Sequence, residues 1–338
     1  MRSTEQVGSA AALEADLLGL WADPPHLPPR WFYDEKGSLL FDEITRLPEY
    51  YPTRCEAEIL RAEAAGIVGD ASTVVELGSG TSEKTRVLLD VLARRSGGAA
   101  TGGAATGGAS TGGTSTSPGG ALFVPVDISE EVLLASARAL DAEYPGVRVE
   151  PVVGDFTALA GPLPGTPGER LVLFLGGTLG NFTEAERAGF WRMLRGVMDA
   201  GDRMAVGFDL VKDPARLEAA YDDAAGVTAE FDLNVLDVIG RTVAVRGLDR
   251  ADFRHESVWN AGESRIEMWL RAVRDVRLEF PTLARDLALA AGEGIRTEIA
   301  RKFTPDELTA ELSGYGFAGR AVWTDAAGDF GMLLAEAG

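Results

Sequence analysis

A short run of residues near position 80 combines two glycines with acidic and hydroxyl side chains: residues 75–85 read VELGSGTSEKT. Gly78 and Gly80 allow a sharp backbone turn and the close approach of a ligand that a Cβ atom would exclude. A dinucleotide site would carry a third glycine where this chain has Glu83, which argues against NAD. Glu76, two residues before Gly78, is typical of sites for a cationic methionine moiety. The glycine pair alone would favour a structural turn.

Two later carboxylates stand where adenosine ligands are bound on strand-turn-helix folds. Asp127 follows Gly80 by 47 residues, or by 23 if the low-complexity tract 97–120 is left out. A carboxylate about 20 residues beyond the glycines accepts the ribose hydroxyls in such sites. Asp155 and Phe156 offer an acceptor for the adenine amino group and an aromatic face for its ring. Each residue alone is typical of a cap or turn, but their order predicts an S-adenosylmethionine site.

Apolar runs alternate with helix-like segments around these residues. The runs lack strict alternation of apolar and polar residues, which is typical of strands covered on both faces. Strand and helix in turn predict an α/β fold with a Rossmann-like, doubly wound parallel sheet. The expected strands are residues 73–77, 122–126, 147–152, 171–175 and 204–210, and the expected helices are residues 82–95, 129–143 and 183–198.

The pattern changes after residue 210. We assign the segments that follow to an inserted α+β lobe, after which the chain returns to the first sheet. A helix is expected at 213–224, lobe strands at 265–273, 276–281 and 295–303, a helix at 304–315, and edge strands at 321–324 and 330–335. The first 60 residues have no place in the sheet. The expected division is a sheet domain of residues 61–227 plus 302–338 and a lobe of residues 14–60 plus 228–301.

Composition excludes several classes of protein. The 338 residues are 46% hydrophobic, enough for a real core, and 52 acidic against 32 basic residues give a net charge of -20, which repels nucleic acid. No apolar run reaches the roughly 18 residues of a membrane span, and the first residues lack the basic-then-apolar order of a secretory signal. We therefore expect a soluble cytoplasmic protein that binds neither nucleic acid nor membrane.

Three features indicate no further chemistry. The tract 97–120 consists of Gly, Ala, Thr, Ser and Pro and is expected to form a flexible loop that acts as a spacer. The two histidines, His26 and His255, stand far apart without a second ligand at a metal-binding spacing, so no metal site is expected. Cys55, the single cysteine, has no nearby histidine to activate it and is expected to be an idle thiol.

Five blocks spread over most of the chain carry a resemblance to one known family. They are WFYD at 31–34, FDEITRLPEYYPTR at 41–54, ELGSGTSEKT at 76–85, GGTLGNF at 176–182 and IRTEI at 295–299. The chain resembles the histidine Nα-methyltransferases of ergothioneine biosynthesis, which include fungal relatives that act on other aromatic amino acids. The resemblance implies a Rossmann-like methyltransferase domain with an inserted substrate-binding lobe and S-adenosyl-L-methionine as cofactor.

The resemblance also implies roles for individual residues. The amino acid substrate would lie between the lobes, with Asn181 and Tyr221 holding its carboxylate and Gly176 near its amine. The implied contacts of the substrate side chain are Tyr50, Met268 and Glu298. The implied cofactor contacts are Tyr33, Gly78, Gly80, Lys84, Asp127, Asp155 and Phe156.

One position departs from the family pattern. Histidine-specific members carry a serine two residues after the pocket glutamate, whereas this chain has Ala300 two residues after Glu298. Glu298 still supplies the acceptor that an imidazole N–H needs, which favours L-histidine, converted to hercynine by three methyl transfers. The missing serine leaves another aromatic amino acid, such as tryptophan or tyrosine, as the alternative substrate.

The implied reaction needs positioning more than acid–base catalysis. The attacking amine must be unprotonated, and a carboxylate in contact with it would hold it as ammonium. We therefore expect deprotonation through water, without a dedicated side-chain base, in a monomeric enzyme. Two other classes remain: a non-catalytic nucleoside-binding protein on the same fold, and an NAD-dependent oxidoreductase, which Glu83 disfavours.

Overall fold

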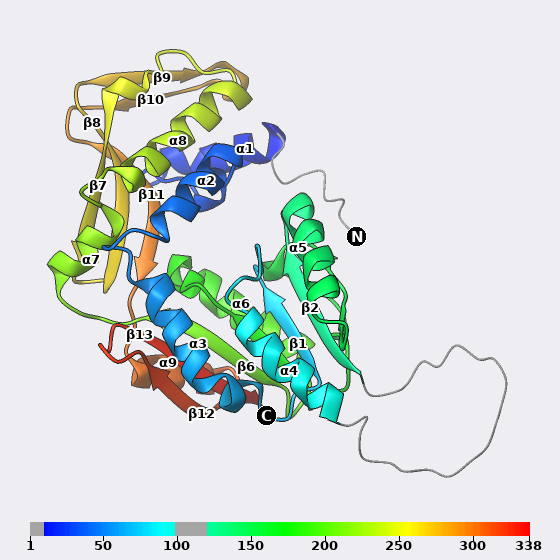
Figure 1. The fold of residues 1–338 in the computed structure, drawn as a ribbon. Coiled ribbons are helices and arrows are strands. Elements are labelled where there is room, and N and C mark those ends of the chain that lie inside the picture. Colours follow the sequence, from blue (N-terminus) through cyan, green and yellow to red (C-terminus); the bar gives the residue numbers. More distant parts are fainter. Residues whose placement is uncertain (1–9, 99–119) are drawn as a thin grey trace, which may run out of the picture. The chain divides into compact units, whose positions relative to one another are not determined.

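The computed structural model describes residues 10–98 and 120–338. They form two compact units (Figure 1). The described residues of the first unit are 10–54, 177–185 and 209–304, and those of the second are 55–98, 120–176, 186–208 and 305–338. Residues 99–119 of the low-complexity tract, expected to be a flexible loop, lie outside the described residues. No helix in the described part of the chain is both long and apolar enough to cross a membrane.

The second unit is built on an eight-stranded sheet with strand order β12-β13-β6-β5-β1-β2-β3 and with β4 paired to β2. The pairs β1–β2, β1–β5, β2–β3, β2–β4 and β5–β6 are parallel, and β12–β13 is antiparallel. The predicted doubly wound α/β sheet is therefore confirmed. The strands are β1 (Thr73–Leu77), β2 (Ala121–Asp127), β3 (Val147–Val149), β4 (Val152–Val153), β5 (Arg170–Phe174), β6 (Arg203–Asp209), β12 (Phe317–Thr324) and β13 (Phe330–Ala337).

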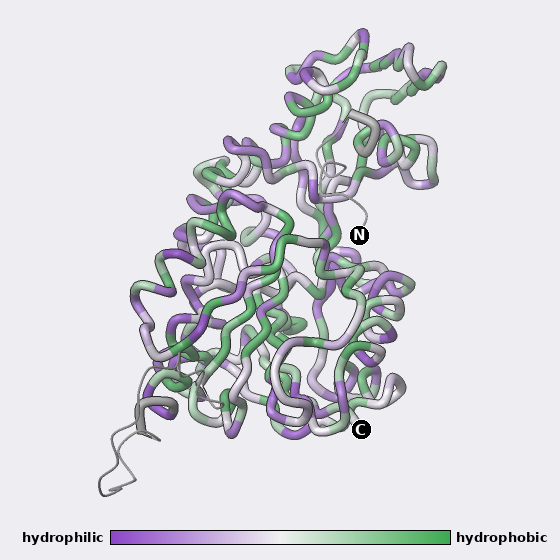
Figure 2. The backbone as a smooth tube through the Cα atoms, turned by 90° about the vertical axis from the view of Figure 1, so that its right-hand side faces the viewer, coloured by the Kyte–Doolittle hydropathy of each residue, from purple (hydrophilic) through white to green (hydrophobic). Residues whose placement is uncertain are grey.

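Apolar side chains on both faces explain these strands. Every residue of β1 and of β5 is buried, as expected of central parallel strands. Figure 2 shows the central strands of this unit coloured largely as hydrophobic, whereas the surrounding helices alternate between the two colours. The expected strand 147–152 is split into β3 and β4, because Pro151 lies between them and has no N–H for a ladder hydrogen bond.

Helices cover the faces of this sheet, and Figure 1 shows α3 and α4 in front of it. The helices are α3 (Pro52–Val68), α4 (Arg86–Gly98), α5 (Glu130–Glu143), α6 (Glu184–Val197) and α9 (Pro305–Gly314). The part of α3 up to residue 60 was not expected beside this sheet, yet the helix buries Ile59, Leu60 and Ile67. Helix α4 begins four residues later than expected, because Ser82 still belongs to the preceding turn with a φ of 50°.

The first unit contains a three-stranded antiparallel sheet, β11-β8-β7, and a two-stranded sheet, β10-β9. Its strands are β7 (Phe253–Asn260), β8 (Arg265–Ala272), β9 (Val276–Phe280), β10 (Arg285–Leu289) and β11 (Gly294–Arg301). Its helices are α1 (Ala10–Asp16), α2 (Glu35–Ile44), α7 (Pro214–Tyr221) and α8 (Val227–Thr242), with short 3-10 turns η2 (Leu17–Trp21), η3 (Pro29–Phe32), η6 (Thr178–Asn181), η7 (Arg250–Asp252) and η8 (Pro281–Leu283).

Helix α8 forms the centre of this unit and was missed in the sequence. It packs against α2 and β7, and its buried face includes Phe231, Val235 and Ile239. Helix α7 packs against β7 and β8. Residues 209–227, which we expected in the sheet domain, therefore belong to the first unit.

Candidate active site

A glycine turn follows β1 in the second unit. Gly78 and Gly80 have φ values of 67° and 50°, a region that side chains with a Cβ rarely adopt. A Cβ at position 78 would lie 3.3 Å from Cε1 of Phe156, so the glycine lets this aromatic ring approach the turn. The structure thus brings together two of the residues expected at the cofactor.

Asp127, at the end of β2, is joined directly to this turn. Its Oδ2 accepts a hydrogen bond from the Gly80 N–H at 2.8 Å, and its Oδ1 accepts one from the Ser129 N–H at 2.9 Å. Asp155 is exposed and caps the turn η5 (Phe156–Ala158) through hydrogen bonds from the N–H and hydroxyl of Thr157. The three strand ends after β1, β2 and β4 therefore bring the predicted cofactor carboxylates to the same edge of the sheet.

Two buried glutamates support the turn. Glu76 is 4% exposed, and its Oε1 accepts a hydrogen bond from the Thr85 hydroxyl, while Oε2 has no hydrogen-bond partner among the described residues. Burial raises the pKa of Glu76 to about 7, although Thr85 and Lys84 favour its ionised form. Glu56 is fully buried; its Oε1 accepts from the Gly176 N–H at 2.7 Å and its Oε2 pairs with Lys84.

Glu56 was missed in the sequence, although a signal exists. It lies on the apolar face of α3, next to Cys55 and one turn before Ile59 and Leu60. A charged residue on the buried face of a helix needs a partner, which marks it as a candidate for a positioning role. Here the partners are Lys84 and Gly176, two residues expected at the cofactor and the substrate amine.

Most residues expected at the substrate lie in the first unit. Glu298 on β11 stands opposite Met268 on β8, next to a bulge at Thr297. Ala300 follows two residues later opposite Ile266, is 3% exposed, and offers no hydroxyl.

Aromatic side chains of the first unit contact Tyr50 and Tyr221, two of the residues expected at the substrate. The rings of Tyr50 and Tyr221 are 6.1 Å apart, edge to face. Phe41 contacts Tyr50 at 6.3 Å and Tyr33 at 5.5 Å between ring centroids. Tyr33, expected at the cofactor, thus lies in the first unit, and Gly176, expected near the amine, lies in the second. Their roles stay predictions.

Asn181 is placed by the close approach of η6 to β11. A Cβ at Gly180 would lie 2.7 Å from the carbonyl oxygen and 3.0 Å from the backbone nitrogen of Arg301. Only glycine therefore allows this contact without displacing the backbone. The side chain of Asn181 is then close enough to Glu298 to lower the pKa of its carboxyl.

We expect Gly180→Ala to push η6 away from β11. Activity on the amino acid substrate should fall by about tenfold or more, because displacement of a binding group by about 1 Å is costly, and unfolding free energy should fall by about 1 to 3 kcal/mol. The matched control is Gly189→Ala in α6, where an added Cβ would meet nothing within 4 Å. Equal kinetics for the two variants would contradict the proposed role of the contact.

Glu298 is electrostatically unusual. Its pKa is raised to about 7, chiefly by burial and also by the nearby carboxylate of Asp232, while Lys302, Asn181 and His255 act in the opposite direction. In the unfolded chain the same carboxyl titrates near its ordinary value of 4.5. Its contribution to stability is therefore fully present below about pH 4.5 and is lost as pH rises through about 7.

This shift predicts a pH-dependent effect of Glu298→Gln on stability. The variant cannot ionise, so relative to the wild type it should gain on the order of 2 kcal/mol of unfolding free energy between pH 4.5 and pH 8. Denaturant unfolding at both pH values measures the difference. If the difference in unfolding free energy between the variant and the wild type were the same at both pH values, the pKa of Glu298 would not be raised in the folded protein.

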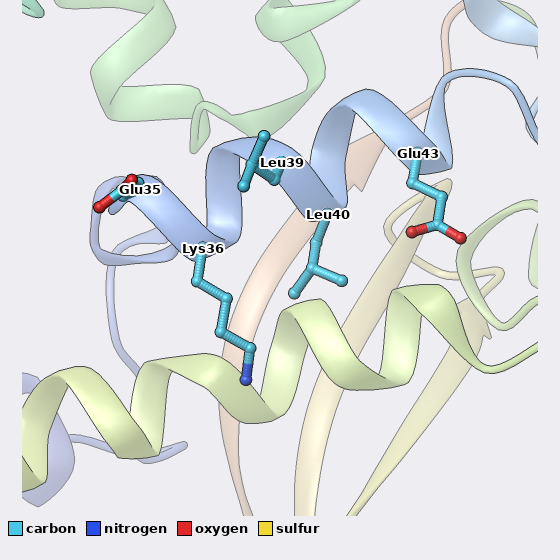
Figure 3. A pocket seen from close by; sticks show the side chains of 5 residues that line it. All are labelled: Glu35, Lys36, Leu39, Leu40 and Glu43. Carbon is cyan, nitrogen blue, oxygen red and sulfur yellow. The ribbon is translucent and has the colours of Figure 1, made fainter.

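Two other features carry no assignment. A groove over α2 is lined by Glu35, Lys36, Leu39, Leu40 and Glu43, and Figure 3 shows Lys36 and Leu40 directed toward the neighbouring helix α8. None of the expected substrate residues lines it.

Cys55, Asp325 and Asp329 lie close together. Oδ1 of Asp325 accepts hydrogen bonds from the N–H groups of Asp329 and Phe330 and so caps a turn. Burial raises the pKa of the Cys55 thiol to about 12.

A family model described as histidine-specific methyltransferase, SAM-dependent, matches residues 13–337. The chain belongs to this family. The histidine N-alpha-methyltransferase of Mycolicibacterium smegmatis is 46% identical over 97% of this chain and 95% of that protein. That of Mycobacterium tuberculosis is 47% identical over 98% of this chain and 96% of that protein.

More distant matches are also found. Ergothioneine biosynthesis protein 1 of Neurospora crassa is 27% identical over 89% of this chain and 32% of that protein. The solved structure of an S-adenosylmethionine-dependent methyltransferase from Clostridium acetobutylicum is 10% identical, with 90% of this chain and 98% of that chain covered and a TM-score of 0.46.

Membership of the family confirms several predictions: the resemblance itself, the enzyme class, methylation of histidine as the reaction of the family, and S-adenosylmethionine as cofactor. The second unit of this SAM-dependent methyltransferase fits such a cofactor chemically. Oε2 of Glu76 and Oγ of Ser79 are buried without partners among the described residues, and they offer acceptors beside the glycine turn for an ammonium group. Asp127 and the ring of Phe156 lie at the same turn.

Proposed function

We propose that this chain transfers three methyl groups from S-adenosylmethionine to the α-amino group of free L-histidine and so forms hercynine for ergothioneine biosynthesis. The observation that supports the choice of histidine is Glu298, a partly buried carboxylate in the same unit as Tyr50, Tyr221 and Met268. A carboxylate in this place accepts an imidazole N–H, and a buried donor without an acceptor would cost about 1 to 3 kcal/mol.

The proposed substrate contacts divide the amino acid into three parts. Asn181 and Tyr221 hold the carboxylate through neutral amide and phenol donors. The contacts of the side chain are Tyr50, Met268, Glu298 and Ala300. Gly176 lies near the amine.

The proposed reaction does not require a side chain of the protein to act as a general base. When bound, S-adenosylmethionine supplies a methyl group on a sulfonium, which is already an activated leaving group. The proposed residues that hold it are Tyr33, Gly78, Gly80, Lys84, Asp127, Asp155 and Phe156. The protein orients the amine lone pair and leaves its proton to water, because a contacting carboxylate would hold the amine as ammonium. Tyrosine rings stabilise the growing cation through their faces.

A second candidate substrate follows from Ala300. The family serine would add a hydroxyl to the imidazole contacts, and the buried methyl group of Ala300 does not. Loss of that hydrogen bond costs about 1 kcal/mol and favours a less polar side chain such as that of tryptophan or tyrosine.

A methyl-transfer panel tests the proposal. The full-length protein is incubated with methyl-labelled S-adenosylmethionine and each free amino acid in turn, with imidazole propionate, which lacks the amine, as the control. We expect label in histidine and a product mass that corresponds to three added methyl groups. Label in tryptophan or tyrosine instead would establish the alternative substrate. Binding of S-adenosylmethionine without transfer to any amino acid would indicate a non-catalytic protein.

We also propose that the enzyme is a monomer of the cytoplasm without a nucleic acid partner. The net charge of -20 supports the last point, because it repels a polyanion. Light scattering of the purified protein tests the oligomeric state.

A further inference from the structure

A buried ammonium group lies beside Tyr221 and has no part in the function as proposed so far. The side chain of Lys302 is 1% exposed. Its Nζ donates a hydrogen bond to the Tyr221 hydroxyl at 2.9 Å, forms an ion pair with Asp209 Oδ2 at 2.7 Å, and lies 4.4 Å from the centroid of the Tyr221 ring. All three residues belong to the first unit.

Backbone hydrogen bonds between the segments that follow β6 and β11 position Lys302 beside Asp209. The N–H of Phe303 donates to the carbonyl of Asp209 at 2.9 Å, where the chain leaving β6 meets the chain leaving β11. Because Lys302 directly precedes Phe303, its side chain starts next to Asp209. The position of the ammonium group is thus determined by backbone contacts, not only by its own ion pair.

Asp209 is shared by more than one cation. The Tyr51 hydroxyl lies 2.7 Å from Oδ2 and 2.9 Å from Oδ1, and Lys212 pairs with Oδ1. Asp209, Lys302 and Lys212 are each less than 10% exposed at the side chain. Within this cluster two ammonium groups share one carboxylate, and Glu298 is a second carboxylate that acts on both Tyr221 and Lys302.

The ammonium group determines the direction of the Tyr221 hydroxyl. An ammonium group can only donate hydrogen bonds, so the phenol oxygen accepts from Lys302 and its own proton must point elsewhere. The pKa of Tyr221 is raised well above its ordinary value by burial and then by Asp209 and Glu298, so the phenol keeps this proton. At its other end, the Tyr221 carbonyl lies 2.8 Å from Nε2 of His255, which holds the backbone.

We propose that Lys302 is a positioning residue for recognition of the substrate carboxylate: its ammonium group orients the Tyr221 proton toward the carboxylate. The inference rests on the proposed role of Tyr221 in carboxylate binding.

The test compares Lys302→Met with the wild type in the full-length enzyme. We expect the KM for histidine to rise by about 10- to 100-fold, because a charge-assisted hydrogen bond and its orienting effect are lost, while kcat changes by less than about threefold. The Kd for S-adenosylmethionine should not change. Histamine, which lacks the carboxylate, serves as a competitive inhibitor whose inhibition constant should stay within about twofold.

Two further variants make the role of Tyr221 explicit. In a Tyr221→Phe background, which has no hydroxyl to orient, Lys302→Met should change the KM far less than in the wild type. Lys302→Gln retains an N–H donor and should give an intermediate KM; it also serves if Lys302→Met fails to fold. Lys36→Met, at an exposed lysine that pairs with Glu230, is the matched control and should leave the KM unchanged.

The outcomes separate this inference from the proposed function. Three results would each overturn the role of Lys302 while the methyltransferase activity stands. They are an unchanged KM for histidine in Lys302→Met, an equal loss of affinity for histidine and for histamine, and additive effects of Lys302→Met and Tyr221→Phe on the KM. A wild-type enzyme that methylates no free amino acid would instead overturn the proposed function and, with it, the basis of this inference.

Discussion

Replacement of Glu298 by alanine is expected to lower kcat/KM for histidine by about 10- to 100-fold. The carboxylate is the acceptor that we assign to the imidazole N–H, and its removal leaves that donor without a partner in a partly buried place. The effect should be selective for histidine, because phenylalanine has no ring N–H and therefore makes no hydrogen bond to Glu298 that the substitution could remove. Kinetics with both amino acids, together with calorimetric binding of S-adenosylmethionine, measure the change.

Glu263→Ala is the matched control for this experiment. Glu263 lies in the turn before β8, and its side chain is 58% exposed. We expect it to leave both substrates unaffected. If histidine turnover by Glu298→Ala equalled that of Glu263→Ala, the assignment of Glu298 to the pocket would be wrong.

Replacement of Asp127 by alanine should weaken binding of S-adenosylmethionine by about 100-fold or more. Two charge-assisted hydrogen bonds to the ribose hydroxyls are lost, each of which is worth about 1.5 to 3 kcal/mol. The carboxylate also accepts from the N–H of Gly80, so part of the loss comes from a looser glycine turn. Titration calorimetry with S-adenosylmethionine measures the affinity.

Two variants separate these contributions. Asp127→Asn keeps an oxygen that can accept from Gly80 but removes the charge, so its affinity should lie between those of the wild type and Asp127→Ala. Asp141→Ala changes an exposed carboxylate on α5 and should bind as the wild type does. Unchanged affinity in Asp127→Ala would remove Asp127 from the ribose role.

The elements that could be predicted are those whose pattern is local. Strand β1 begins and ends at Thr73 and Leu77 as expected, because a short, mostly apolar run that leads into a glycine turn is a local signal. Helix α8 was missed although Phe231, Val235 and Ile239 follow helical spacing, since polar Asp232 and Asn234 are also buried in it and blur the pattern. Residues 55–60, in the first half of α3, were expected in the lobe but belong to the second unit, because amphipathic spacing shows that a helix has a buried face but not which surface covers it.

The candidate site divides in the same way. Gly78 and Gly80 were found because a turn at a strand end depends on adjacent residues. Asp127 was found from its distance in sequence to Gly80 with the tract 97–120 left out, and the structure joins the two by a hydrogen bond. Glu56 and Lys302 were not found. A charged residue in a helix or after a strand is ordinarily solvated, and nothing in its neighbours along the chain shows that it is buried and paired.

By itself, the sequence determined the α/β class and the residues of the glycine turn, because each depends on the pattern within adjacent elements. It also determined the family and the cofactor, because five blocks of residues spread along the chain match a known pattern. Only the tertiary structure decided the partners of the buried charges. Tyr51, Asp209, Tyr221 and Lys302 are separated by up to 251 positions and meet through the pairing of Asp209 with Phe303. Such a cluster is stable because its charges satisfy one another away from water, a condition that depends on three-dimensional contact and leaves no periodic pattern in the chain.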